Sequence, residues 1–257
     1  MKPDQNDHLR GLNTILFDLG STLIYFNSDW QEVMPQAVDA LRSRLTSYGY
    51  DLDNNEFQQS FGQALREYYV ERDTEFIEYT TTYLLNSHME QWGYTGVPES
   101  HIEEAVRAFY EISERYWYPE PDAVPTLRAL KDRGFRMGIV SNAGDDQDVQ
   151  ALVDKAGVRD YFEVILSSAA VGIRKPNPKI FDLALESIGS KPSQAAMVGD
   201  TLGADILGAQ NAGLLDIWIT RWADTPANRA HLDTIHPTLQ IGNLAQLTTL
   251  LPATAEQ

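Results

Sequence analysis

Short apolar segments alternate with amphipathic segments along most of the chain. Five short runs are rich in β-branched, aliphatic and aromatic residues and do not alternate strictly with polar positions: 12–17, 136–140, 162–166, 195–198 and 216–220. Such runs are typical of strands that are buried on both faces of a sheet. Between two of them, Asn177 and Pro178 predict an N-cap and a first helical turn, which an apolar stripe from Ile180 to Ile188 follows. The alternation predicts a doubly wound parallel sheet.

The segment 28–118 departs from this alternation because its apolar positions recur at helical spacing. Ser28 and Gln31 form a capping-box pattern, which predicts that a helix begins there and ends near Gly49. Three further helices are predicted from the apolar positions at 57–68, 76–84 and 102–112. We therefore expect an α/β fold with a Rossmann-like core, residues 1–27 and 119–257, and a second, all-helical domain, residues 28–118.

Composition and charge limit the classes of function. The 257 residues are 43% hydrophobic, which is enough for a substantial core, and carry a formal net charge of -17. This charge disfavours nucleic acid and anionic membranes as partners, because both attract Lys and Arg. An anionic substrate would need a locally positive site, from a cation or from placed Lys and Arg side chains.

Targeting signals and cysteine chemistry are not predicted. There are no cysteines, which excludes thiolate metal sites and cysteine nucleophiles. The first residues, MKPDQNDHLRGLN, are polar and lack the apolar run of a signal peptide, and no stretch approaches the roughly 18 apolar residues of a membrane helix. We expect a cytoplasmic protein; the sequence makes no prediction of oligomeric state.

Polar residues occur where the predicted strands end. Asp18 follows the first strand, Ser141 and Asn142 follow the second, and Asp200 follows the fourth. Lys175 lies in the loop after the third strand. In a doubly wound sheet, ligands bind beyond the carboxyl ends of the strands. These side chains are therefore expected to converge on one rim.

Each of these residues can take part in phosphoryl transfer. Asp18 is a carboxylate that can attack phosphorus and hold the group as an aspartyl phosphate. Asp200 and Asp205 can bind Mg²⁺, which prefers a few carboxylates, waters and substrate oxygens. Lys175 and the hydroxyl of Ser141 can interact with the oxygens of the transferred group. One such residue alone is an ordinary turn or cap residue, so the prediction depends on their common order and placement.

This order resembles that of the haloacid dehalogenase superfamily. The patterns are hhhDxxxT, hhhSN, a KP loop and hhGDxxxxD, where h is apolar, and they fall within residues 12–250. The resemblance implies a magnesium-dependent phosphatase that acts on small anionic phosphate esters through an aspartyl phosphate. It also implies that the helical segment is a cap that closes over the substrate. The implied roles are nucleophile for Asp18, charge stabilisation for Lys175, phosphate binding for Ser141 and Asn142, and metal binding for Asp18, Asp200, Asp205 and the backbone carbonyl of Gly20.

Gly20 is the main departure from the family pattern. Most phosphatases that this chain resembles carry Asp at that position, where it protonates the leaving oxygen and then activates water, although some members of the family carry FDLGN or a close variant. General acid–base catalysis contributes about 10²- to 10⁴-fold. If the protein is a phosphatase, water, Ser21, Thr22 or a residue of the helical segment such as His88 must replace that function.

Two alternatives remain open at this point. The first is a 2-haloacid dehalogenase, which needs no general acid because halide leaves unprotonated. However, the dehalogenases that this chain resembles work without a metal, so they would not need both Asp200 and Asp205. A binding or regulatory protein with a disabled site would not need to keep Asp18, Ser141 and Lys175. The phosphatase is therefore the main prediction.

Overall fold

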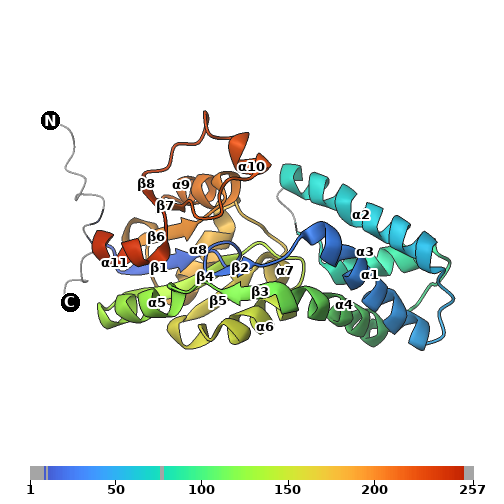
Figure 1. Cartoon of the computed structure of the whole chain (residues 1–257). Helices are drawn as coiled ribbons and strands as arrows, with labels where there is room; N and C mark the ends of the chain where they lie inside the picture. The colour runs from blue at the N-terminus through green and yellow to red at the C-terminus, as the bar shows by residue number, and fades with distance from the viewer. Residues whose placement is uncertain (1–8, 10, 76–77, 252–257) are drawn as a thin grey trace.

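A six-stranded parallel sheet forms the centre of the protein in a computed structural model that describes residues 9, 11–75 and 78–251 (Figure 1). The strand order is β5-β4-β1-β6-β7-β8, and every neighbouring pair is parallel. The strands are β1 (Thr14–Phe17), β4 (Arg136–Ser141), β5 (Val164–Ser167), β6 (Ala195–Gly199), β7 (Leu215–Ile219) and β8 (Leu239–Ile241). The predicted α/β parallel sheet is confirmed: the five predicted runs form five of its six strands, and the edge strand β8 was not predicted.

Side chains of β1 point alternately to the two faces of the sheet. Ile15 and Phe17 pack in the core cluster that contains α5 (Ala123–Asp132), α6 (Asp146–Ala156) and α11 (Leu247–Leu250). Leu16 packs on the opposite face with α8 (Pro178–Ile188) and α9 (Leu207–Ala212). Helices therefore cover both faces, which explains why the strands are continuously apolar.

The ends of α8 follow the sequence prediction. The Asn177 side chain accepts a hydrogen bond from the backbone N–H of Lys179, and Pro178 occupies the first turn. Gly189 ends the helix in the left-handed conformation, with φ of 74°. Residues between the caps bury the predicted stripe against β1 and its neighbours: Ile180, Phe181, Ala184, Leu185 and Ile188.

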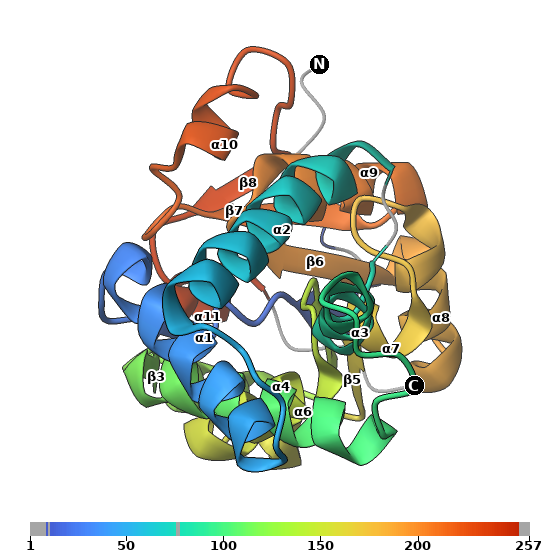
Figure 2. The ribbon, with the colours of Figure 1, turned by 90° about the vertical axis from the view of Figure 1, so that its right-hand side faces the viewer.

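Four helices form a bundle beyond one end of the sheet (Figure 2). They are α1 (Trp30–Ser47), α2 (Asn54–Glu75), α3 (Thr81–Gln91) and α4 (Glu99–Ser113), and they share a separate apolar core. The predicted cap at Ser28 is wrong, because the side chain of Asp29 accepts from the backbone of Gln31. Two residues assigned to the third helix, Phe76 and Ile77, lie outside the described residues.

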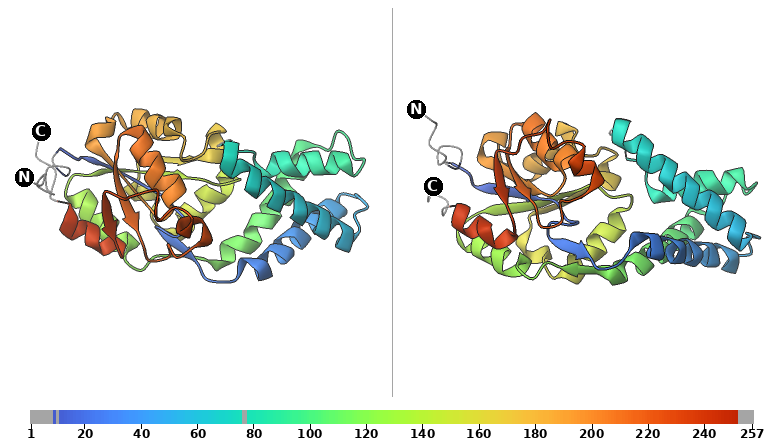
Figure 3. Two further views of the ribbon diagram at one scale, coloured as in Figure 1. Left: turned by 90° about the horizontal axis from the view of Figure 1, so that it is seen from above. Right: turned by 45° about the horizontal axis from the view of Figure 1, so that its top comes forward.

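A short antiparallel ribbon joins the bundle to the sheet (Figure 3). It pairs β2 (Ile24–Phe26) with β3 (Trp117–Pro119), and neither strand was predicted. The ribbon lies at the two predicted boundaries between the core and the helical segment. Short helices α7 (Ser168–Val171) and α10 (Pro226–Arg229) complete the fold. Within the described part of the chain, every helix is too short or too polar to cross a membrane.

Candidate active site

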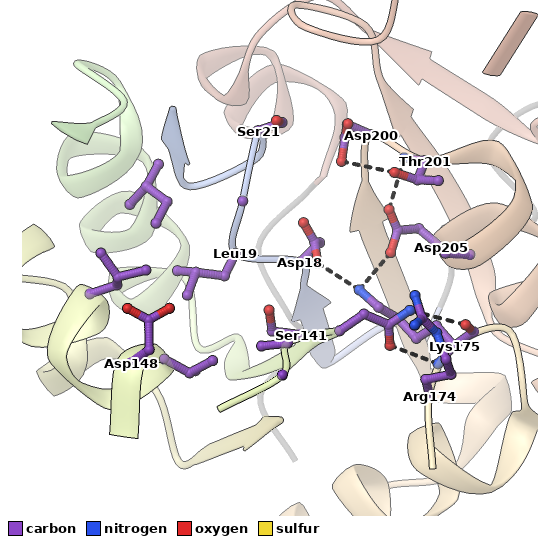
Figure 4. A pocket seen from close by; sticks show the side chains of 18 of the residues that line it. Asp18, Leu19, Ser21, Ser141, Asp148, Arg174, Lys175, Asp200, Thr201 and Asp205 are labelled. Atoms are coloured by element: carbon purple, nitrogen blue, oxygen red, sulfur yellow. Dashed lines mark hydrogen bonds and ion pairs between the residues drawn. The ribbon is translucent and has the colours of Figure 1, made fainter. Parts of the chain in front are cut away.

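A cavity of about 600 Å³ lies between the carboxyl ends of the strands and the helical bundle. Three of the residues that line it lie at strand ends: Asp18 follows β1, Ser141 is the last residue of β4, and Asp200 follows β6. Lys175 comes from the loop that leads from β5 to α8, and Asp205 from the helical turn after β6 (Figure 4). The sheet thus brings together the five charged or hydroxyl residues that the strand-end argument selected.

Lys175 is at the centre of the buried charges. Its Nζ atom lies 2.6 Å from Asp18 Oδ1, 2.7 Å from Asp205 Oδ1 and 2.7 Å from the carbonyl oxygen of Val140. The ammonium group donates hydrogen bonds to Asp18 and to the Val140 carbonyl, and Asp205 lies at ion-pair distance. The side chain is 1% exposed, and we infer that these contacts hold the ammonium group in one position.

Asn142 holds the loop that carries Lys175. Its Oδ1 atom accepts from the backbone N–H of Lys175 at 2.8 Å, and its Nδ2 atom donates to the carbonyl oxygen of the same residue at 3.0 Å. Both ends of the Asn142 amide are therefore used within the protein. The predicted role of Asn142 in phosphate binding stays a prediction, and its side chain has a positioning role that the sequence did not indicate.

Asp205 reaches the site through a turn of π-helix, Leu202–Ile206. Its Oδ2 atom accepts from the backbone N–H of Thr201 at 2.9 Å. The carboxylate also lies against Gly199, where a Cβ atom would be only 2.3 Å from Asp205 Cγ. The glycine of the Gly199-Asp200 pair is therefore required by close packing, and π-turns of this kind are frequent at functional sites.

The carboxylates form a group that fits a divalent cation. One ligand atom from each of Asp18, Asp200 and Asp205 lies within 4.8 Å of the others. Burial and the charges of Asp18 and Asp205 raise the pKa of Asp200 well above its ordinary value, and burial raises the pKa of Asp18 to about 6 despite Lys175. Burial would lower the pKa of Lys175, but Asp18 and Asp205 raise it. Oxygen ligands from a small number of carboxylates match the preferences of Mg²⁺.

Two residues that sequence reasoning missed fix the backbone of Asp200. The carbonyl oxygen of Asp200 accepts from Trp218 Nε1 and from Asn228 Nδ2, each at 2.8 Å. Asn228 Oδ1 also accepts from the backbone N–H of Leu202 at 2.7 Å, and Asn228 is 2% exposed. These contacts position the acidic loop from β7 and α10. No local sequence signal marks either residue, because their contacts are made across 18 and 28 positions.

Trp117 occupies the space beside Gly20. A Cβ atom on Gly20 would lie 3.3 Å from Cη2 of the Trp117 ring, a tight contact. Gly20 is not in the left-handed region, so its backbone does not require glycine. Ser21 lines the cavity with a φ of 57°, whereas the side chain of Thr22 is fully buried. Of these two hydroxyl candidates for proton transfer, Ser21 is the one that faces the cavity.

The hypothesis that His88 transfers a proton at this site is wrong. The residue is 4% exposed within the bundle, where its ring contacts Phe57 and Phe61 and its Nε2 atom lies 3.0 Å from Ser60 Oγ. Burial lowers its pKa. Its position on α3 directs it into the apolar core of the bundle, and it does not line the cavity.

The bundle supplies the opposite wall of the cavity and contacts the sheet domain directly. Trp30, Tyr110 and Ser113 of α1 and α4 line this wall. The backbone N–H of Thr81 donates to the carbonyl oxygen of Gly144 at 2.8 Å. Arg174, next to Lys175, pairs with the buried Glu78 at 3.4 Å. The helical segment thus encloses the acidic site from the side that faces away from the strands.

Comparison with known proteins agrees with the motif order. A family model of haloacid dehalogenase-like hydrolases matches residues 12–213. A pyrimidine 5′-nucleotidase of Escherichia coli is 32% identical over 240 residues, covering 92% of this chain and 96% of the relative. A glyceraldehyde 3-phosphate phosphatase of Methanopyrus kandleri is 29% identical over 210 residues, covering 82% and 84%. The crystal structure of a 2-haloacid dehalogenase from Pseudomonas syringae is similar with a TM-score of 0.66 and 27% identity, covering 93% of this chain and 97% of that one.

Proposed function

Because this chain belongs to the haloacid dehalogenase-like hydrolase family, we propose that it is a magnesium-dependent phosphatase that hydrolyses small organic phosphate esters through a phosphoryl group held on Asp18. The observation that carries this proposal is the grouping of Asp18, Asp200 and Asp205 around the ammonium group of Lys175. A dehalogenase needs the nucleophile and the lysine, but it has no evident need for two further buried carboxylates.

In the proposed reaction, a carboxylate oxygen of Asp18 attacks phosphorus and the bond between phosphorus and the leaving oxygen breaks. The ammonium group of Lys175 and the hydroxyl of Ser141 stabilise negative charge on the phosphoryl oxygens. The departing oxygen takes up a proton from solvent. A water molecule then attacks phosphorus and loses a proton to solvent, the bond from phosphorus to Asp18 breaks, and inorganic phosphate leaves. Magnesium held by Asp18, Asp200, Asp205 and the Gly20 carbonyl would supply further positive charge at these oxygens.

The class of substrate follows from the cavity and the relatives together. Two relatives of comparable length act on a pyrimidine nucleotide and on glyceraldehyde 3-phosphate, both small phosphate monoesters. A cavity of about 600 Å³ is within the range for small-molecule sites. Small anionic phosphate esters are therefore the proposed substrates, and the local charge of Lys175 and the cation would attract them despite the net charge of -17.

We further propose that residues 28–118 act as a cap. Trp30 and Tyr110 supply part of the cavity wall, and Thr81 and Glu78 bind the sheet domain at Gly144, Arg174 and Ser168. Enclosure of the site on this side would exclude water from the phosphoryl group before hydrolysis. On this basis the cap selects the leaving group, while the strand ends perform the chemistry.

The test is a panel of phosphate esters assayed for inorganic phosphate with magnesium and with a chelator. Asp18→Asn should abolish turnover, and Asp182→Asn, an exposed carboxylate on α8, serves as the matched control. Chloride release from 2-chloropropionate is measured in parallel. Turnover of that compound without metal, or a folded protein that hydrolyses no ester on the panel, would contradict the proposal.

A further inference from the structure

A buried carboxylate of the helical segment is connected to the two loops that carry Ser141 and Lys175. Glu78 lies between α2 and α3, and its side chain is 0% exposed. Its Oε2 atom accepts a hydrogen bond from Ser168 Oγ at 2.8 Å and lies 3.4 Å from Arg174 Nη1. Both partners belong to the sheet domain, on the segment that leads from β5 to α8. A carboxylate buried in this way depends on such partners, because an unpaired buried charge is costly.

Ser168 connects this carboxylate to the loop that carries Ser141. The Oγ atom of Ser168 donates to the carboxylate and accepts from the backbone N–H of Ala143 at 2.9 Å, and Ser168 is fully buried. Ala143 lies two residues after Ser141 in the chain. A second contact of the bundle, from the backbone N–H of Thr81 to the carbonyl oxygen of Gly144, holds the same loop at 2.8 Å. The bundle therefore fixes this loop at two successive residues.

Arg174 connects Glu78 to the loop that carries Lys175. Arg174 directly precedes Lys175, is 6% exposed and lines the cavity (Figure 4). The amide of Asn142 bonds to the backbone N–H and carbonyl of Lys175 at 2.8 and 3.0 Å, so the two loops are also joined to each other. On the bundle side, Tyr68 of α2 donates to Glu78 Oε1 at 2.6 Å. One oriented carboxylate thus links the bundle to both loops.

We infer that Glu78 is a positioning residue, which sets the relative placement of the Ser141 hydroxyl and the Lys175 ammonium group when the bundle contacts the sheet domain. The inference rests on the proposed phosphatase function, in which those two groups stabilise charge on the same phosphoryl oxygens. It gives the helical segment a part in the chemistry, in addition to the selection of the leaving group. Stabilisation of this kind requires fixed donors, and a displacement of about 1 Å can lower the rate about 10²-fold.

The experiment measures kcat and KM for p-nitrophenyl phosphate, phenyl phosphate and glycerol 1-phosphate at saturating magnesium. The variants are Glu78→Ala, Glu78→Gln, Ser168→Ala and the double variant Glu78→Ala with Ser168→Ala. Gln has nearly the same size as Glu and keeps an oxygen that can accept from Ser168, so it is the conservative replacement. Glu103→Gln, an exposed carboxylate on α4, is the matched control. Thermal melts establish that each variant is folded under the assay conditions.

Glu78→Ala should lower kcat about 10- to 100-fold, by the same factor for every ester, because Ser141 and Lys175 contact the phosphoryl group that all esters share. KM should stay within about threefold, as expected when an interaction that acts in the transition state is lost. Glu78→Gln should recover most of the loss. The double variant should lose little more than Glu78→Ala, because Ser168 acts through the same contact.

An unchanged kcat in folded Glu78→Ala would overturn the inference. A rise in KM at constant kcat, or a loss confined to some esters, would also overturn it, since either would assign Glu78 to substrate selection. If Glu78→Ala is unfolded, Ser168→Ala decides by the same criteria. Hydrolysis of p-nitrophenyl phosphate by the natural protein in these cases would leave the phosphatase function standing, whereas no hydrolysis of any ester by the natural protein would remove both.

Discussion

Replacing Gly20 by aspartate is expected to restore acid catalysis only when the ring of Trp117 is also reduced. The backbone of Gly20 accepts an ordinary residue, since its φ is not positive. The obstacle is the contact of 3.3 Å between a new Cβ atom and Cη2 of Trp117. Overpacking of this kind costs about 1–3 kcal/mol and would displace the new carboxyl group. Gly20→Asp alone should therefore change activity little and lower stability.

The double variant Gly20→Asp with Trp117→Leu removes that contact. A positioned general acid and base contributes about 10²- to 10⁴-fold, or about 3–5 kcal/mol. Assistance matters most where the departing oxygen is most basic, so we expect alkyl phosphates to gain about 10²-fold or more and aryl phosphates far less. Trp117→Leu alone is the control and should give no selective gain.

The assay is a plot of log kcat/KM against the pKa of the leaving alcohol for the natural protein and the three variants. We expect a steep decline for the natural protein and a shallow one for the double variant. A flat line for the natural protein would show that another group, such as Ser21 or a water molecule, already delivers the proton. An equal gain on alkyl and aryl phosphates would refute the reasoning about Gly20.

Three further predictions follow from the buried polar groups. Burial raises the pKa of Asp148 above its unfolded value, so the stability that this carboxyl contributes is present below about pH 4 and is lost as pH rises. Asp148→Asn should therefore match the natural protein in thermal melts near pH 4 and exceed it increasingly toward pH 8; a constant difference would contradict this. Lys175→Met leaves two buried carboxylates without their cation and should cost about 3–5 kcal/mol in urea unfolding, whereas Lys179→Met, on the exposed side of α8, should cost almost nothing. Asn228→Ala removes a donor to the Asp200 carbonyl and should weaken magnesium affinity about 10- to 100-fold in calorimetric titrations; an unchanged affinity would show that Trp218 alone holds the loop.

The parts of the fold that follow from local pattern were predicted, and those that depend on distant partners were not. Runs such as 136–140 identify strands because β-branched and aliphatic residues are concentrated there. The edge strand β8 and the ribbon strands β2 and β3 have three residues each, which is too few for a period to be read. Ser28 and Asp29 are equally good caps by type, so the choice between them needed the backbone.

The same distinction holds for the candidate site. The sequence could identify Asp18, Lys175 and Asp205 as site residues because each lies shortly after a predicted strand. Parallel strands bring the positions at their carboxyl ends to one rim. The burial of Asp148 at the cavity wall could not be predicted, because an acidic residue in a first helical turn is ordinary and its charged neighbours Arg107 and Glu114 are distant in the sequence. His88 was misjudged because its helix turns it toward Phe57 and Phe61.

The central claim is that Asp18 carries the phosphoryl group during turnover. The direct measurement is a single turnover with a phosphate ester and magnesium, quenched in acid and followed by mass spectrometry of the peptide that contains Asp18. We expect a phosphoryl group on that residue, absent in Asp18→Asn and without magnesium. Hydrolysis of the ester with no phosphorylated peptide at any quench time, or with undiminished turnover in Asp18→Asn, would contradict the account.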